Sequence, residues 1–177
     1  MATGARSAGL GDRDRRLDDN ERTPAQWFCL IIGPTLILVG LLGFLVDPRF
    51  DTQDGSAPFN GDSLLGVLEV NGWHNLVHIA SGVFLLAMAK RHAAARSAAL
   101  IFAAIYAVVT VIGFIDGQDV LGFMPVNTMD NILHLVFALA GLLAGLAPAG
   151  RDRDEVARRG AVVGETRSTQ RGQTTHV

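Results

Sequence analysis

Long apolar stretches without a charged residue dominate this sequence and restrict the folds open to it. The first runs from Trp27 to Val46 and holds 20 residues without a charge. At a helical rise of about 1.5 Å per residue it spans roughly 30 Å, the thickness of the hydrocarbon core of a bilayer. It is too long for the apolar core of a signal peptide, which has roughly 7–15 residues. Similar runs follow, and we predict spans at about 27–46, 71–89, 97–115 and 127–147.

Charged residues are scarce and unevenly distributed, and this distribution predicts the topology. Only 18% of the 177 residues are charged, whereas a soluble domain has about a quarter. Of the 15 Lys and Arg residues, all but Arg49 lie near the two ends of the chain or in the connection 90–96. The positive-inside rule therefore predicts a multi-pass protein of a bacterial inner membrane, with the N- and C-termini in the cytoplasm.

The ends of the chain differ in composition from its apolar middle. Residues 1–22 and 150–177 are rich in charged and small polar residues, so we predict disordered cytoplasmic tails around a transmembrane domain at 23–149. Asp, Gly and Pro accumulate at 47–63, where we expect a loop. The net charge of −2, with mixed signs at both ends, argues against a nucleic-acid partner. The single cysteine, Cys29, excludes an intrachain disulfide and a two-cysteine metal motif.

An internal repeat connects the second and fourth predicted spans. Six matches within a 14-residue window recur after 56 residues and indicate a duplication. Leu65, Gly66, Val70, Asn71, Asn75 and His78 recur as Leu121, Gly122, Val126, Asn127, Asn131 and His134. Each repeat would contain two spans. We therefore predict an all-α fold, an integral membrane four-helix bundle built from two duplicated helical hairpins.

Each repeat also places polar residues on one face of a helix. The spacing i, i+3, i+4, i+7 gives a candidate polar cluster of Asn71, His74, Asn75 and His78 with Asn127, Asp130, Asn131 and His134. Polar groups in hydrocarbon are costly and normally face the protein interior, so we expect the two faces to meet. We interpret Asn71 and Asn127 as helix N-caps. The second asparagine of each face is expected to hydrogen-bond between helices.

Three functions are open for this cluster. In the leading hypothesis the protein is not an enzyme, carries no cofactor, and uses the Asn/His cluster to join the two hairpins. In the second, His78 and His134 are paired ligands for a haem iron or another metal ion in a membrane redox component. In the third, a proton or small-solute path runs through His74, Asp130, His78 and His134. A contact between His74 and Asp130 is a separate expectation.

The doubled Leu-Gly…Val-Asn…Asn…His pattern resembles the bacterial membrane family called domain of unknown function 4383. The stretches that carry the resemblance are LLGVLEVNGWHNLVHIASG and LGFMPVNTMDNILHLVFALAGLL, within about residues 25–147. The repeats differ where Pro125 replaces Glu69 and Asp130 replaces His74. The resemblance implies an integral membrane protein without assigned activity, and it transfers no catalytic residues. The bilayer is the expected partner, and protein partners and a homo-oligomer are left open.

Overall fold

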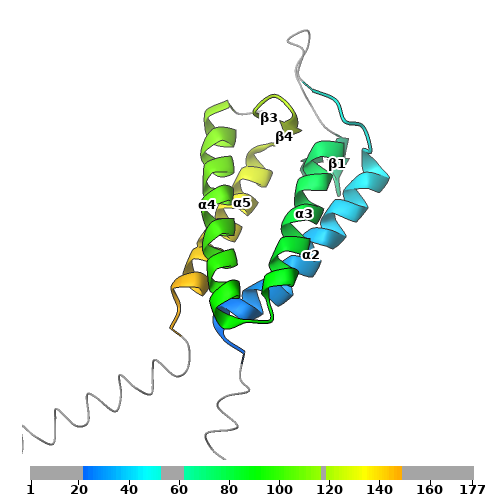
Figure 1. The fold of residues 1–177 in the computed structure, drawn as a ribbon. Helices are drawn as coiled ribbons and strands as arrows, with labels where there is room; N and C mark the ends of the chain where they lie inside the picture. Colours follow the sequence, from blue (N-terminus) through cyan, green and yellow to red (C-terminus); the bar gives the residue numbers. More distant parts are fainter. Residues whose placement is uncertain (1–21, 53–61, 117–118, 149–177) are drawn as a thin grey trace, which may run out of the picture. The chain divides into compact units, whose positions relative to one another are not determined.

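A computed structural model of the chain describes residues 22–52, 62–116 and 119–148 (Figure 1). All the described helices and strands belong to one compact unit, Pro24–Ala147. The tail predicted at 150–177 lies outside the described residues, as does the tail predicted at 1–22 apart from Arg22.

The fold is all-α with short strands, and three of its helices are long and apolar enough to cross a membrane. The described helices are α2 (Pro24–Val46), α3 (Gly72–Met88), α4 (His92–Asp116) and α5 (Thr128–Leu146). The three apolar candidates are α2, α4 and α5, while α3 has 17 residues and carries His74 and His78. α2 packs mainly against α3, and α4 packs mainly against α5. α2 and α4 run toward the end at which α3 and α5 begin (Figure 1).

The helices follow the charge-free runs closely, with one difference at α4. α3 and α5 each begin directly after the asparagine that the sequence predicts as their N-cap. α4 begins at His92, five residues before the span predicted from Ser97. Its first turns can carry a charge because Nε of Arg96 donates to the carbonyl of Gly145, 3.0 Å away near the end of α5. The helix therefore extends beyond the stretch that composition alone marks as apolar.

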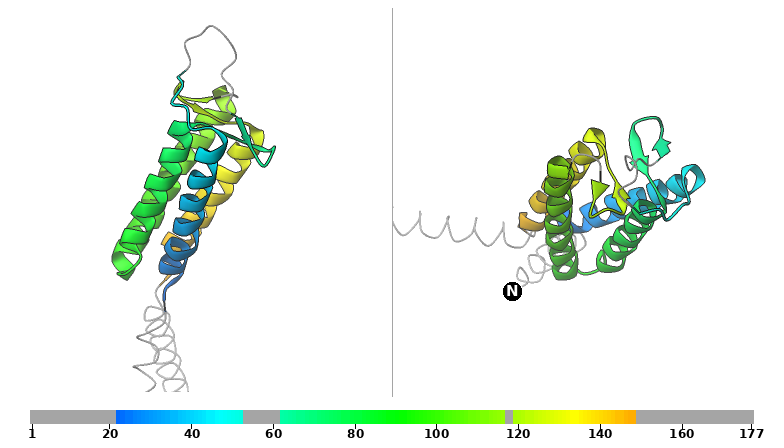
Figure 2. Two further views of the ribbon diagram at one scale, coloured as in Figure 1. Left: turned by 90° about the vertical axis from the view of Figure 1, so that its right-hand side faces the viewer. Right: turned by 90° about the horizontal axis from the view of Figure 1, so that it is seen from above.

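Two β-hairpins that the sequence did not predict precede α3 and α5. β1 (Asp62–Leu64) pairs antiparallel with β2 (Leu68–Val70), and β3 (Asp119–Val120) with β4 (Met124–Pro125). Ser63, assigned to a loop by composition, thus lies in β1. Both hairpins lie at the same end of the helices (Figure 2).

The repeated Leu-Gly dipeptides form the turns of these hairpins. Leu65 and Leu121 have φ of 55° and 59°, and Gly66 and Gly122 have φ of 73° and 75°. Two successive positive φ values are characteristic of type I′ turns, which favour Asn-Gly rather than Leu-Gly. Because leucine is rarely found in this conformation, the dipeptides did not identify the turns in the sequence.

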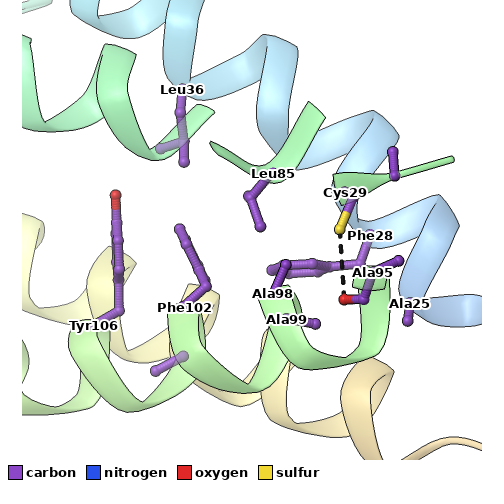
Figure 3. Close-up of a cluster of buried hydrophobic side chains, with 12 residues drawn as sticks. Ala25, Phe28, Cys29, Leu36, Leu85, Ala95, Ala98, Ala99, Phe102 and Tyr106 are labelled. Carbon is purple, nitrogen blue, oxygen red and sulfur yellow. Dashed lines mark hydrogen bonds between the residues drawn. The ribbon is translucent and has the colours of Figure 1, made fainter. Parts of the chain in front are cut away.

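The interior and the surface of the helical unit have an unusual distribution of side-chain sizes. Half of the main buried apolar cluster consists of alanines, which surround Phe28, Leu36, Leu85 and Phe102 (Figure 3). Many large aliphatic side chains point outward; on α4 these include Ile101, Ile105, Val108 and Val111, with 49–58% of their surface exposed. Small residues inside and large apolar residues outside are typical of helices packed in lipid.

Candidate metal centre

The two N-terminal caps position the polar faces of α3 and α5. The side-chain oxygen of Asn71 accepts the backbone N–H of His74 at 2.9 Å. The side chain of Asn127 accepts the N–H groups of Met129 and Asp130, and Asp130 completes a capping box by accepting the N–H of Asn127 at 3.0 Å. Both cap predictions are thus confirmed.

Each capping asparagine also reaches the hairpin that precedes the other helix. Nδ2 of Asn71 donates to the carbonyl of Phe123, and Nδ2 of Asn127 donates to the carbonyl of Val67, both at 2.8 Å. The donors are 56 positions apart in the sequence, and so are the acceptors. The two bonds therefore relate equivalent positions in a reciprocal way, and they join the two helix pairs at their hairpin end.

A second pair of contacts also joins equivalent positions of the two repeats, but the side chain donates in one contact and accepts in the other. Nδ1 of His74 lies 3.0 Å from the carbonyl of Pro125, while Oδ2 of Asp130 accepts the N–H of Glu69 at 3.0 Å. Proline has no N–H, so the backbone facing His74 offers only an acceptor. The proton of His74 must then be on Nδ1, and Nε2 carries a lone pair. The contact that we considered between His74 and Asp130 is replaced by these bonds to the hairpins.

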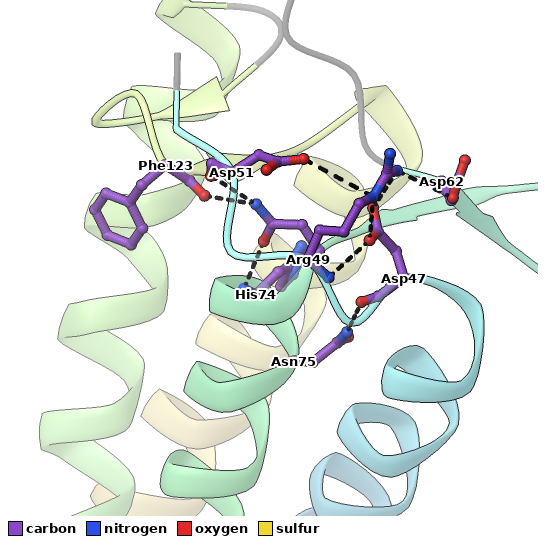
Figure 4. A network of polar contacts seen from close by, with 8 residues as sticks. Asp47, Arg49, Asp51, Asp62, His74, Asn75 and Phe123 are labelled. Carbon is purple, nitrogen blue, oxygen red and sulfur yellow. Dashed lines mark hydrogen bonds and ion pairs between the residues drawn. The ribbon is translucent and has the colours of Figure 1, made fainter. Parts of the chain in front are cut away.

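The second asparagine of each face lies against a glycine of the neighbouring helix. Nδ2 of Asn75 donates to the carbonyl of Asp47 at 2.9 Å, just after α2 ends (Figure 4). A Cβ at Gly43 would collide with Oδ1 of Asn75, and a Cβ at Gly113 would collide with Oδ1 of Asn131. Neither of these two oxygens has a hydrogen-bond partner among the described residues. The glycines admit the amides into the interior.

Three histidines meet beneath the caps. The ring centroids of His74 and His78 are 4.5 Å apart, and His134 lies 5.7 and 6.1 Å from them. All three side chains are buried, and one potential ligand nitrogen from each lies within 4.8 Å of the others. Within the described part of the chain, Nε2 of His74, both ring nitrogens of His78 and Nδ1 of His134 have no hydrogen-bond partner. Buried polar atoms normally have a partner, so these four atoms need an explanation.

Tyr106 on α4 marks the inner limit of the cluster. Its ring stands edge-on to His134 with centroids 5.4 Å apart, and it stacks on Phe102 at 3.9 Å. Its buried hydroxyl has Ser81 of α3 as a potential side-chain hydrogen-bond partner, although no well-formed hydrogen bond is present among the described residues. Figure 3 shows this hydroxyl at the edge of the apolar cluster. Beyond it, toward the start of α2, the described core is apolar apart from Cys29, whose Sγ faces the carbonyl of Ala95.

A charged network lies outside the helices at the hairpin end (Figure 4). Arg49 contacts both carboxylate oxygens of Asp47 at 2.9 and 3.0 Å and reaches Asp62 at 3.2 Å. The hydrogen bond from the Arg49 side chain lowers the pKa of Asp47 and raises the pKa of the guanidinium. Burial raises the pKa of Glu69. The network fixes the end of α2 beside the carbonyl that accepts from Asn75.

The sequence indicated all eight candidate polar residues but neither the ligand role of His74 nor the position of Tyr106 beside the histidines. All eight candidate residues lie at the hairpin end, either at a cap, beside a glycine or in the histidine group. His74 was not predicted as a third ligand, although its spacing of four from His78 suggested proximity. Tyr106 was missed because a lone tyrosine in an apolar run resembles a packing residue; it is the only tyrosine of the chain.

This arrangement suits the binding of a metal ion. Imidazole nitrogens bind zinc, copper, iron and nickel, and a ligating histidine usually donates its other N–H to a backbone carbonyl or carboxylate. His74 has this second bond, to Pro125.

Comparison with known proteins defines the family of the chain but adds no activity. No curated protein and no solved structure matches it. Residues 26–147 match the family model described as domain of unknown function (DUF4383). Since this match covers most of the chain and agrees with the resemblance in the repeats, the chain belongs to the DUF4383 family.

Proposed function

We propose that this chain is an integral membrane protein whose three buried histidines, His74, His78 and His134, bind one transition-metal ion. The observation that carries the proposal is the set of four unpartnered ring nitrogens on these side chains, counted over the described residues. A metal ion would accept lone pairs from three of them without any rearrangement of the backbone. The ligand atoms lie within 4.8 Å of one another and would have to approach to roughly 3.3 Å, the separation at a tetrahedral ion.

The membrane part of the proposal is a bundle of four spans in a bacterial inner membrane, with both termini in the cytoplasm. The three long apolar helices, the outward aliphatic side chains and the distribution of Lys and Arg support it. α3 would be the shortest span, and its polar first turns would face the histidine group rather than lipid.

We further propose that the bundle consists of two duplicated helical hairpins. Equivalent positions have the same turn geometry at Leu65 and Leu121, the same caps at Asn71 and Asn127, and the same type of glycine–asparagine contact. The reciprocal bonds between the halves are also related by the interval of 56 residues. These bonds thus relate positions, such as Val67 and Phe123, at which the two repeats have different residues.

A metal ion accounts for the histidines better than the structural role that we first expected. That role requires His78 and His134 to be hydrogen-bonded by asparagines or backbone carbonyls. The side-chain amides of Asn71, Asn75 and Asn127 instead donate to loop and hairpin carbonyls. Neither nitrogen of His78 has a partner among the residues described. Joining the two halves is better assigned to the reciprocal bonds of the caps, His74 and Asp130.

The two other hypotheses are less compatible with the geometry. A haem between His78 and His134 would need the space that His74 occupies, since its ring lies 4.5 and 5.7 Å from theirs. A path for protons or small solutes would have to continue through the bundle. The polar groups end at Tyr106, and the described core beyond it is built from alanine, phenylalanine and leucine side chains.

Metal analysis of the purified protein tests the proposal. After gentle extraction in mild detergent and dialysis, we expect about one metal ion per chain and no Soret band. His78→Gln and His134→Gln should each abolish retention. His92→Gln, which changes a histidine outside the cluster, should retain the metal.

Other results would favour the other hypotheses. Metal-free protein that loses thermal stability on His78→Ala would support a structural role. A histidine-dependent proton or solute flux in liposomes would support a path. Metal bound equally well by all the variants would contradict the assignment of the site.

A further inference from the structure

The ligand group of the proposed site consists entirely of neutral imidazoles. In the described ranges, neither a carboxylate nor a thiolate belongs to the group within 4.8 Å, and the single cysteine, Cys29, lies in the apolar cluster. From this ligand set, and resting on the proposed metal-binding function, we infer that the site is selective for monovalent copper, Cu(I), over the divalent ions Zn(II) and Cu(II).

Charge is the first reason for this selectivity. Neutral ligands leave the whole charge of the ion in the buried site, because no anionic ligand offsets it. The cost of moving an ion into a low dielectric rises with the square of its charge, so a divalent ion costs about four times as much as a monovalent one. The three histidines are 1–7% exposed, so water does little to reduce this cost.

The carboxylate nearest in sequence to a ligand does not change the charge balance. Asp130 lies one helical turn before His134 and is buried. Its Oδ2 already accepts two backbone N–H groups, from Asn127 and Glu69, at the N-terminal end of α5. These donors and the helix dipole compensate the carboxylate locally.

Coordination number is the second reason. Zn(II) sites are almost always four-coordinate, and a site with three protein ligands adds a water molecule. Cu(I), in contrast, forms stable three-coordinate complexes and needs no fourth ligand. A further oxygen that could reach an ion is the hydroxyl of Tyr106, on the ring that faces His134. If Tyr106 bound the ion as a phenolate, it would favour a divalent or trivalent ion. The Tyr106→Phe variant therefore distinguishes a site with a phenolate ligand from a site with three imidazole ligands alone.

Competition between metals tests this inference on the full-length protein in detergent. We expect one Cu(I) per chain under anaerobic, reducing conditions, measured with bicinchoninate as the competing chelator. Zn(II), measured with a chromogenic chelator, should bind at least about 100-fold more weakly. His134→Gln should weaken Cu(I) binding by about 100-fold or more, since even outer-shell changes cost 10–100-fold. Tyr106→Phe should leave Cu(I) affinity unchanged.

The outcomes separate this inference from the function on which it rests. Stoichiometric, histidine-dependent Zn(II) with no preference for Cu(I) would overturn the selectivity and leave the metal site intact. A loss of binding on Tyr106→Phe would also overturn it. No binding of either ion would overturn both proposals. X-ray absorption of the copper-loaded wild-type protein gives an answer even if the histidine variants fail to fold. Three imidazole ligands support the inference, and sulfur or phenolate ligands contradict it.

Discussion

In each of the two main helix pairs, a glycine of one helix lies against a buried asparagine of the other. Gly43 faces the amide of Asn75, and Gly113 faces the amide of Asn131. A hydrogen atom is the only side chain that fits there, because the amide oxygen occupies the position of a Cβ. Small residues at such contacts allow helices in lipid to approach closely.

Gly43→Ala and Gly113→Ala should each destabilise the protein by about 1–3 kcal/mol, the typical cost of overpacking. The added methyl group would displace a buried amide, and at Asn75 this also strains the bond to the carbonyl of Asp47. Thermal unfolding in detergent measures the loss. Gly145→Ala is the matched control, because its Cβ meets mainly the flexible side chain of Leu100. Equal losses at all three positions would contradict the explanation.

The ion pair of Asp47 and Arg49 should give the protein an acid-sensitive contribution to stability. The pKa of Asp47 is lowered in the folded state, so its ionised form stabilises the fold. This contribution is fully present above the unfolded pKa of about 4 and is lost as the pH falls through the lower, folded pKa. We expect melting temperatures between pH 3 and 7 to show an acid limb that Asp47→Asn flattens. Asp51→Asn, an exposed carboxyl 3.8 Å from Arg49, should leave the limb largely in place.

At the level of the elements, the hairpins are the strained parts of the fold. Leu65 and Leu121 adopt positive φ, which costs an L-residue roughly 1–2 kcal/mol, and 85% and 70% of their surface is exposed. The strain recurs at equivalent positions of both halves. The hairpins support the cross-connections, since Val67 and Phe123, the residues after each turn, provide the acceptors for the capping asparagines.

Leu65→Asn should stabilise the protein by about 1 kcal/mol, because asparagine tolerates the left-handed conformation at lower cost. Gly66→Ala should destabilise it by about the same amount, although its Cβ would meet nothing within 4 Å. Chemical unfolding of both variants tests the sign of each change. A destabilising Leu65→Asn would indicate that the exposed leucine makes a contact worth more than its strain.

The sequence predicted the helices well because lipid requires long charge-free runs and because Asn71 and Asn127 are typical caps. It did not predict the hairpins, since leucine is an unusual residue for the turn that it occupies. It placed His74 in the polar cluster but did not predict it as a third ligand. Its role depends on a bond between His74 and Pro125, 51 residues apart, and such a bond has no periodic signature.

At the level of the whole molecule, polarity is arranged in the opposite way to a soluble protein. The buried set includes asparagines, histidines and aspartates, while many large aliphatic residues lie outside. Such a surface is stable when lipid covers it, and the polar interior is protected from lipid by the same helices. This arrangement and the distribution of Lys and Arg support the same topology.

Accessibility of single cysteines should establish that topology. In a Cys29→Ser background, Ser63→Cys in the exposed strand β1 should react with a membrane-impermeant maleimide in intact cells. Ser7→Cys and Ser168→Cys should react only after the membrane is permeabilised. Labelling of Ser7→Cys in intact cells would reverse the proposed orientation, and opposite results at the two ends would exclude an even number of spans.

His74 donates to the hairpin that faces it, whereas Asp130 accepts from the hairpin that faces it. This difference has a consequence for pairing between two copies of the same half. If residues 92–177 were produced alone and paired with a second copy, the carboxylate of Asp130 would meet the carbonyl of Pro125, and neither could donate a hydrogen bond. Residues 1–91 provide what that half lacks, the N–H of Glu69 and the ring of His74. The second half therefore distinguishes its complement from a copy of itself. Coexpressed halves should copurify, whereas two differently tagged copies of 92–177 should not.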